Sequence, residues 1–177
     1  DYDKQNGVTL IIAMDCGITA IQQVAKAKTL GIDFIICDHH KPKETLPEAI
    51  AILDPQRNDC NYPYEELSGC GITFKLAQAI AQKNDFPWIE LIDLLEFVAI
   101  SIACDIVPIT GENRVLTYFG LKKLNTTKRV GMQALIDQSN RKFPLSISDV
   151  VFGLGPLINA AGRLADAHIA VRLMLSH

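Results

Sequence analysis

The sequence lacks the features of a disulfide-stabilised, zinc–cysteine or membrane protein. It has no CxxC pair, and its odd number of cysteines argues against a disulfide framework and a cysteine-rich zinc site. The longest apolar runs, residues 8–14 and 98–104, are too short to cross a bilayer, and no N-terminal signal pattern is present. We therefore expect reduced thiols, a cytoplasmic localisation and no membrane partner.

The chain also lacks a surplus of basic residues. Its 17 Lys and Arg residues against 20 Asp and Glu residues give a net charge of −3. A stand-alone nucleic-acid binder usually carries extra positive charge to meet phosphates. Either the substrate is small, or the basic surface lies elsewhere. Because the sequence starts at Asp1 without Met and stops at His177 within a helical pattern, we expect an internal piece of a longer polypeptide.

Three short apolar runs rich in β-branched residues predict parallel strands covered on both faces: residues 8–14, 32–37 and 49–53. Apolar residues at helical spacing predict a helix over residues 18–30, which Gly31 follows as a C-cap. This order is typical of a right-handed βαβ unit. A turn-rich loop follows, and then come helical patterns over residues 71–83, 87–103, 112–124, 131–138 and 164–176.

The predicted fold class is therefore α/β, with a parallel sheet of βαβ units flanked by helices and followed by a mainly helical half. A length of 177 residues and a hydrophobic content of 49% suffice to bury a core. The α/β part with the polar motifs is expected over residues 1–110, and the helical remainder over residues 111–177.

Polar clusters follow the apolar runs at three places. Asp15 ends the first predicted strand, Asp38, His39 and His40 end the second, and Asp105 ends a later apolar helix. Because ligands of open parallel sheets bind beyond the carboxyl ends of the strands, the first two clusters should converge, and Asp105 could reach the same crevice. Carboxylates and imidazoles that converge are typical ligands of Mn²⁺, Mg²⁺ or Zn²⁺.

Structural roles compete with this interpretation. A lone aspartate at a strand end, such as Asp15, more often caps a turn or a helix, and Asp105 could simply end its helix. Two adjacent imidazoles have little structural use at a buried edge, so His39 and His40 favour function. Each acid also has a cysteine beside it. On a strand, neighbouring side chains point to opposite faces, which argues against thiolate ligands.

With these residues, the chain resembles the DHH superfamily of phosphoesterases, named after the triplet found here at residues 38–40. The order of Asp15, this triplet and Asp105 is similar to the second, third and fourth motifs of that superfamily. Three further segments are similar to its RecJ family of single-strand-specific exonucleases: LSGCGITFKLAQA (67–79), CDIVPITGENR (104–114) and GPLINAAGRL (155–164). The similarity extends over essentially the whole chain.

The resemblance implies roles for the polar residues. Asp15 would bridge two Mn²⁺ or Mg²⁺ ions, and His39 and Asp105 would ligate one of them. His40 would face the scissile phosphate. Asp38 would not bind the metal directly and would instead orient an imidazole by accepting a hydrogen bond from it. Asp15, His39, His40 and Asp105 are thus the predicted catalytic residues.

Two residues of the last segment are implied to bind substrate together with His40. Arg163 would hold a phosphate of the strand, because a guanidinium fork suits that group, and Asn159 would assist it. The implied activity is 5′ to 3′ degradation of single-stranded DNA in recombination and repair. Single-stranded DNA is then the partner, and a single-strand-binding protein and a helicase are further candidates.

The first motif of the superfamily, two aspartates at a strand end followed by glycine, is expected upstream. The segment Asp1-Tyr2-Asp3 lacks the glycine and helix that should follow, so it is interpreted as a polar helix end. We expect this chain alone to bind metal weakly and to show little nuclease activity, with DHHA1 and OB-type domains lying further along. Oligoribonucleases and cyclic-dinucleotide phosphodiesterases of the superfamily, and a non-catalytic scaffold, remain alternatives.

Weaker patterns have a structural and a functional interpretation. The glycines of residues 69–71 open either a core helix or a phosphate-binding turn, with Lys75 as an exposed lysine or a phosphate contact. The aromatic residues of the 62–64 loop either pack or stack on bases. A basic cluster at Lys122, Lys123, Lys128 and Arg129 is interpreted as a solvated face.

Overall fold

The computed structural model describes residues 2–164 and 167–176, with side chains described at residues 3–161 and 168–176. It contains two compact units, Asp1–Asp85 and Phe86–His177. No helix in the described part of the chain is long and apolar enough to cross a membrane. The polar motifs of the sequence predict a division of the chain after residue 110. That division stays a prediction.

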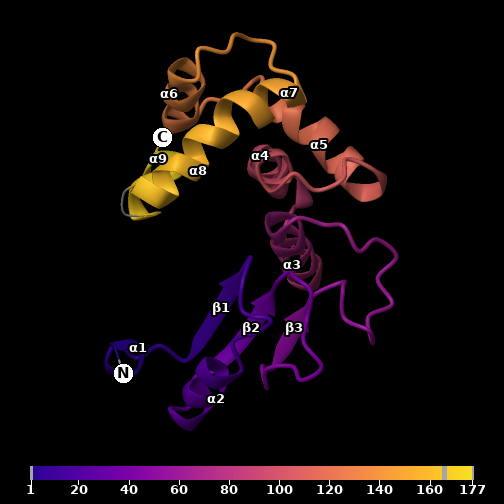
Figure 1. Cartoon of the computed structure of the whole chain (residues 1–177), viewed down its shortest axis with the longest axis vertical. Helices are drawn as coiled ribbons and strands as arrows, with labels where there is room; N and C mark the ends of the chain where they lie inside the picture. The colour runs from indigo at the N-terminus through magenta and orange to yellow at the C-terminus, as the bar shows by residue number, and fades with distance from the viewer. Residues whose placement is uncertain (1, 165–166, 177) are drawn as a thin grey trace. The chain divides into compact units, whose positions relative to one another are not determined.

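The first unit is built on a parallel three-stranded sheet in the order β1 (Leu10–Met14), β2 (Asp33–Cys37) and β3 (Ala51–Leu53) (Figure 1). The register pairs Met14 with Cys37 and Cys37 with Leu53, so the three strands end side by side. The parallel sheet is confirmed, although β1 and β3 each begin two residues later than predicted. The residues that follow the three strands therefore lie close together, beyond the carboxyl ends of the strands.

Three helices belong to this unit: α1 (Tyr2–Gln5), α2 (Ile21–Thr29) and α3 (Gly69–Lys83). Gly31 adopts a left-handed conformation, with φ 70°, just after the end of α2, as its C-cap position predicts. Val24 and Ala27 are buried on α2, and α3 contacts β1 and β2. The segment between β3 and α3 has no helix or strand, which agrees with the predicted loop.

The prediction that all strands are covered on both faces is wrong for β1. Its side chains alternate, with Leu10, Ile12 and Met14 exposed by 41%, 37% and 52%. The reason is position, because β1 lies at the edge of the described sheet whereas β2 lies at its centre. β2 accordingly ends in fully buried residues, Ile36 and Cys37.

The second unit is helical. A 3₁₀ segment (Trp88–Leu94) leads into α4 (Leu95–Asp105), so the single helix predicted over residues 87–103 is wrong in its first half. The helices α5 (Gly111–Leu124), α6 (Val130–Gln138) and α9 (Ala167–Leu175) match predicted patterns. The short α7 (Ile147–Asp149), a π-helical turn (Val150–Leu154) and α8 (Gly155–Leu164) were not predicted. The core gathers around residues such as Leu124, Met132, Ile136, Val150 and Leu154.

Candidate metal centre

Asp15 leaves the sheet at the end of β1 in a left-handed backbone conformation. Its φ is 62°, and its N–H donates to Cys37 O at 2.8 Å, which extends the pairing with β2 by one residue. Aspartate tolerates this conformation better than most residues. Gly17 follows with φ 110°, where a Cβ would lie 3.2 Å from Ala13 Cβ. The chain thus turns sharply at the strand end and leaves the Asp15 side chain 52% exposed.

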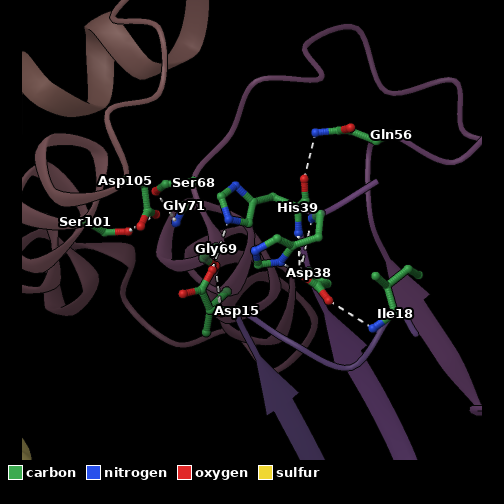
Figure 2. A network of polar contacts seen from close by, with 12 residues as sticks. Asp15, Ile18, Asp38, His39, Gln56, Ser68, Gly69, Gly71, Ser101 and Asp105 are labelled. Atoms are coloured by element: carbon green, nitrogen blue, oxygen red, sulfur yellow. Dashed lines mark hydrogen bonds and ion pairs between the residues drawn. The ribbon is translucent and has the colours of Figure 1, made fainter. Parts of the chain in front are cut away.

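Asp38 is the buried first residue of the DHH segment (residues 38–40), with only 1% of its side chain exposed. Its Oδ2 accepts from Ile18 N–H at 2.9 Å, and its Oδ1 accepts from His39 N–H at 2.8 Å and from Nδ1 of His40 at 2.6 Å (Figure 2). Burial alone would raise the pKa of Asp38, but these donors outweigh it and hold that pKa below its ordinary value. Asp38 therefore orients an imidazole, as predicted, and that imidazole belongs to His40.

Asp15, His39 and His40 form a cluster beyond the carboxyl ends of β1 and β2. His39 Nε2 lies 3.1 Å from Asp15 Oδ1, and the two imidazole rings meet edge to face with centroids 4.7 Å apart. One potential ligand atom from each of the three residues lies within 4.8 Å of the others. The predicted convergence of the first two motifs is thus confirmed, whereas the individual roles stay predictions.

This donor set suits a divalent ion. Because Asp38 is a carboxylate and can only accept, Nδ1 of His40 carries the hydrogen of this bond, and Nε2 is the ring atom open to an ion or a phosphate. One carboxylate and two imidazoles are ligand types that Mn²⁺ and Zn²⁺ accept, and Mg²⁺ takes the carboxylate oxygen. The side chains present therefore fit the metal that the resemblance implies.

The first turn of α3 packs against Asp15. A Cβ at Gly69 would lie 2.0 Å from Asp15 Oδ1 and 2.7 Å from Asp15 Cβ, so no larger residue fits without moving that side chain. Ser68 is the N-cap, and its Oγ accepts from Gly71 N–H at 3.2 Å. A helix N-terminus also favours nearby negative charge. The sequence predicts the core helix but not this contact, which depends on tertiary packing.

Two polar residues after β3 support the site and are absent from the predicted set. Gln56 Nε2 donates to His39 O at 2.7 Å, and Gln56 N–H donates to Asp54 Oδ1 at 2.9 Å. Asp54 is 2% exposed, and burial raises its pKa against the opposing donation from Gln56. A signal was present, because Asp54 follows the third apolar run just as Asp15 and Asp38 follow the first two.

Cysteine takes no part in this cluster among the residues that the structure describes. Cys37 precedes Asp38 on β2, is fully buried, and has its pKa raised by that burial. Cys16 is exposed beside Asp15 but lies outside the group of candidate ligands. The expectation that the neighbouring cysteine faces the core holds for Cys37 on β2 but is wrong for Cys16, because Cys16 lies beyond the end of β1 and is exposed.

Asp105 is the last residue of α4, in the second unit. Ile106 follows with φ 55°, and Ser101 Oγ donates to Asp105 Oδ2 at 3.2 Å. Asp105 thus ends a helix, as its structural interpretation predicts. Asp15 belongs to the other unit, so the expectation that Asp105 reaches the same site as Asp15 stays a prediction.

The two predicted phosphate contacts belong to α8. Asn159 is exposed, whereas the side chain of Arg163 lies outside the described residues. Both substrate-binding roles therefore stay predictions.

The basic cluster at residues 122–129 is not simply a solvated face, and that prediction is wrong for Arg129. Its Nε lies 2.5 Å from Glu96 Oε1, and its guanidinium lies 4.9 Å from the ring centroid of Phe97. Glu96 has a side chain only 5% exposed, so it requires a charged partner. Lys123 is engaged as well, with Asp93 at 2.5 Å.

Comparisons with known proteins identify the family of this chain. The family model described as "DHH family, N-terminal domain" matches residues 2–102. The chain is 42% identical over 186 residues to the single-stranded-DNA-specific exonuclease RecJ of Salmonella typhimurium, across 99% of this chain and 32% of that protein. It is 41% identical over 174 residues to RecJ of Bacillus subtilis, across 98% of this chain and 21% of that protein. The chain thus spans about a third or less of the length of these curated relatives.

A solved structure has the same architecture. The crystal structure of RecJ from Thermus thermophilus in complex with Mn²⁺ matches with a TM-score of 0.83 and 26% identity, over 99% of this chain and 26% of that one. The α/β fold with its parallel sheet and flanking helices agrees with this neighbour. The matched family region covers more than half of the sequence and holds both Asp15 and the triplet at residues 38–40. The chain belongs to the DHH family.

Proposed function

We propose that this chain is the metal-binding core of a phosphodiesterase that removes nucleotides from single-stranded DNA, as the RecJ exonucleases that it resembles do. One observation carries the proposal: Asp15, His39 and His40 cluster beyond the carboxyl ends of two parallel strands. Support comes from the 42% identity to a single-stranded-DNA-specific exonuclease. Digestion from 5′ to 3′, a role in recombination and repair, a cytoplasmic location and contacts with single-strand-binding protein or a helicase belong to the same proposal.

The residues of the candidate site have different roles in the proposed reaction. Asp15 and His39, with Asp105, would hold Mn²⁺ or Mg²⁺, which when bound supplies positive charge at the phosphate and lowers the pKa of the attacking water. His40 is held through Nδ1 by Asp38, and its Nε2 would face the reacting phosphate rather than the ion.

The surrounding residues hold this arrangement fixed. Gly69 confines the Asp15 carboxylate, and Gln56 fastens the His39 backbone. Arg163 and Asn159 would bind a phosphate of the strand. A site held on strand ends and a helix start in this way needs little rearrangement before reaction.

The test uses the intact protein that carries this chain, with a 5′-phosphorylated single strand as substrate. Degradation should require Mn²⁺ or Mg²⁺ and stop with EDTA. Asp15→Asn and His39→Ala should each lower kcat at least about 100-fold, since even residues behind the ligands of a metal contribute about 10- to 100-fold. Asp33→Asn is the matched control, because Asp33 is an exposed carboxylate at the opposite end of β2 and should leave kcat unchanged.

Two alternatives give different results in the same assay. A protein that prefers short oligoribonucleotides or cyclic dinucleotides over DNA strands belongs to another branch of the DHH phosphoesterases. A protein that binds neither Mn²⁺ nor Mg²⁺ in calorimetry and hydrolyses none of these substrates is a scaffold. Either result overturns the proposal.

A further inference from the structure

A polar pocket of about 340 Å³ lies beside the DHH segment, within the first unit. One wall comes from the segment that follows His40, and the other comes from the turn that follows β3. The lining includes Lys41, Lys43, Glu44, Gln56, Arg57 and Asp59. We call it the lysine pocket. At about 30 Å³ per molecule it has room for roughly eleven waters, which is ample for one phosphate group.

The lysine pocket begins next to the candidate metal centre. Lys41 is joined directly to His40, so the Cα atoms of these two residues are about 3.8 Å apart. Gln56 belongs to the lining, and its Nε2 donates to His39 O at 2.7 Å (Figure 2). A strand that has one phosphate at the metal centre therefore has this pocket as its immediate neighbour.

The charges of the lining leave two lysines available. Arg57 and Asp59 neutralise each other, because Nε and Nη2 of Arg57 donate to the two carboxylate oxygens at 3.0 and 2.6 Å. Lys41 and Lys43 are exposed, and neither has a hydrogen bond or an ion pair with any described residue. With Glu44, the lining has three cations and two carboxylates, a net charge of +1 in a chain whose net charge is −3.

We propose that the lysine pocket binds a phosphate of the single strand other than the scissile one, through Lys41 and Lys43. This inference rests on the proposed function. A lysine ammonium group is a compact charge on a flexible stem, so it binds phosphate oxygens without reading a base. Contacts of this kind fix the position of the strand and contribute an affinity that falls with salt.

The first experiment measures KM and kcat of the intact protein with Mn²⁺ on a 5′-phosphorylated single strand. Lys41→Gln and Lys43→Gln should each raise KM about fivefold, leave kcat unchanged, and reduce the slope of log KM against log salt by about 1. Lys26→Gln is the matched control, because Lys26 is an exposed lysine on α2 and its loss changes the net charge equally. An unchanged KM in both pocket variants, or an equal rise in Lys26→Gln, overturns the assignment.

The second experiment reverses the sign of the effect. Glu44→Gln removes a negative charge from the same lining, so KM for the strand should fall. A KM that stays constant or rises in Glu44→Gln would show that the strand does not pass this lining.

The third experiment separates the pocket from the scissile phosphate. The p-nitrophenyl ester of thymidine 5′-monophosphate carries a single phosphate, so Lys41→Gln and Lys43→Gln should hydrolyse it as the unmodified protein does. A loss as large as that with the strand would place the two lysines at the scissile phosphate and refute the proposal.

A site for free phosphate would give another pattern. Calorimetry with inorganic phosphate would then detect binding that Lys41→Gln abolishes, while KM for the strand stays the same in both lysine variants. That combination also contradicts the proposal.

The two proposals fail separately. Mn²⁺-dependent degradation of single strands that is indifferent to both lysines removes the pocket assignment and leaves the proposed function. A protein that binds single strands through Lys41 and Lys43 in fluorescence anisotropy but degrades none removes the proposed function and leaves the pocket as a phosphate site.

Discussion

Asp38 accepts four hydrogen bonds while almost none of its surface is exposed, from Ile18 N–H, His39 N–H, His40 N–H and His40 Nδ1. In Asp38→Asn one oxygen becomes an N–H₂ group, so at least one buried donor loses its acceptor. Each such loss costs about 1–3 kcal/mol. We expect the free energy of unfolding in urea to fall by about that amount and Mn²⁺ affinity to fall with it. An unchanged unfolding midpoint would contradict the anchoring role.

The same residue predicts a pH dependence. Because the pKa of Asp38 in the folded state lies below its unfolded value, its contribution to stability is complete above the unfolded pKa and is lost as the pH falls through the folded pKa. The stability difference between the unmodified chain and Asp38→Asn should therefore be constant from pH 7 to about pH 5 and shrink below about pH 4. Urea titrations at each pH measure it, and a difference that grows in acid would contradict the assignment.

Gly69 is the second residue whose environment decides its identity. In Gly69→Ala the new Cβ displaces the Asp15 side chain, because it would lie 2.0 Å from Asp15 Oδ1. Mn²⁺ affinity and kcat should fall at least about tenfold, since misplaced ligand support costs about 10- to 100-fold. Gly71→Ala is the matched control, as its Cβ would come no closer than 3.3 Å to Ser68 Oγ. Equal Mn²⁺ affinities in the two variants would show that Gly69 does not position Asp15.

At the scale of elements, the sequence predicts the sheet well because parallel strands are short apolar runs. The strand cores and the helices α2, α3, α5 and α6 lie where periodicity places them. Residues 147–164 escape prediction because Gly155, Pro156 and Gly162 resemble helix breakers. In the structure the helical path runs without a break from Ile147 to Leu164, and a π-helical turn, Val150–Leu154, comes just before Pro156. The division of residues 88–105 into a 3₁₀ segment and α4 leaves the apolar pattern unchanged, so periodicity cannot reveal it.

The candidate site is also predictable from the sequence only in part. Asp15, Asp38, His39 and His40 are predictable because each follows an apolar run at a strand end. Contacts with Gly69 and Gln56 arise from tertiary packing of a later helix and loop, which no local pattern encodes.

The contact between α4 and the segment before α6 supplies an element-scale prediction. Glu96 on α4 is paired with Arg129, and both side chains are largely buried. Arg129→Gln leaves the Glu96 carboxylate without its partner, which should lower the free energy of unfolding by about 3–5 kcal/mol. The double variant with Glu96→Gln should recover part of that loss.

The neighbouring ion pair is the control for this double-mutant cycle. Lys123 and Asp93 are more exposed, and Lys123→Gln should cost less than about 1 kcal/mol in the same urea titration. Equal losses for Lys123→Gln and Arg129→Gln would show that burial of Glu96 does not decide the effect.

At the scale of the whole molecule, the net charge limits the non-specific affinity that this chain can have for DNA. Its net charge is −3, and at least five of its 17 Lys and Arg side chains are paired with carboxylates in the described part of the chain. These pairs include Lys28–Glu48, Arg57–Asp59, Lys123–Asp93, Arg129–Glu96 and Arg141–Asp149. Under the proposed function, we therefore expect specific contacts near the candidate metal centre, rather than a broad basic surface, to bind the nucleotide.

This balance predicts weak binding of single strands by the 177-residue chain. Phosphate contacts by cations supply non-specific affinity and its salt dependence, so a chain without a surplus of cations should have a Kd above about 10⁻⁴ M and a shallow salt slope. Fluorescence anisotropy with a labelled oligothymidine at about 50 and about 200 mM salt measures both quantities. A Kd below about 10⁻⁶ M with a steep slope would mean that the basic cluster at residues 122–129 exchanges its carboxylate partners for phosphates. In that case Arg129→Gln should weaken binding, whereas if the ion pairs persist it leaves the affinity unchanged.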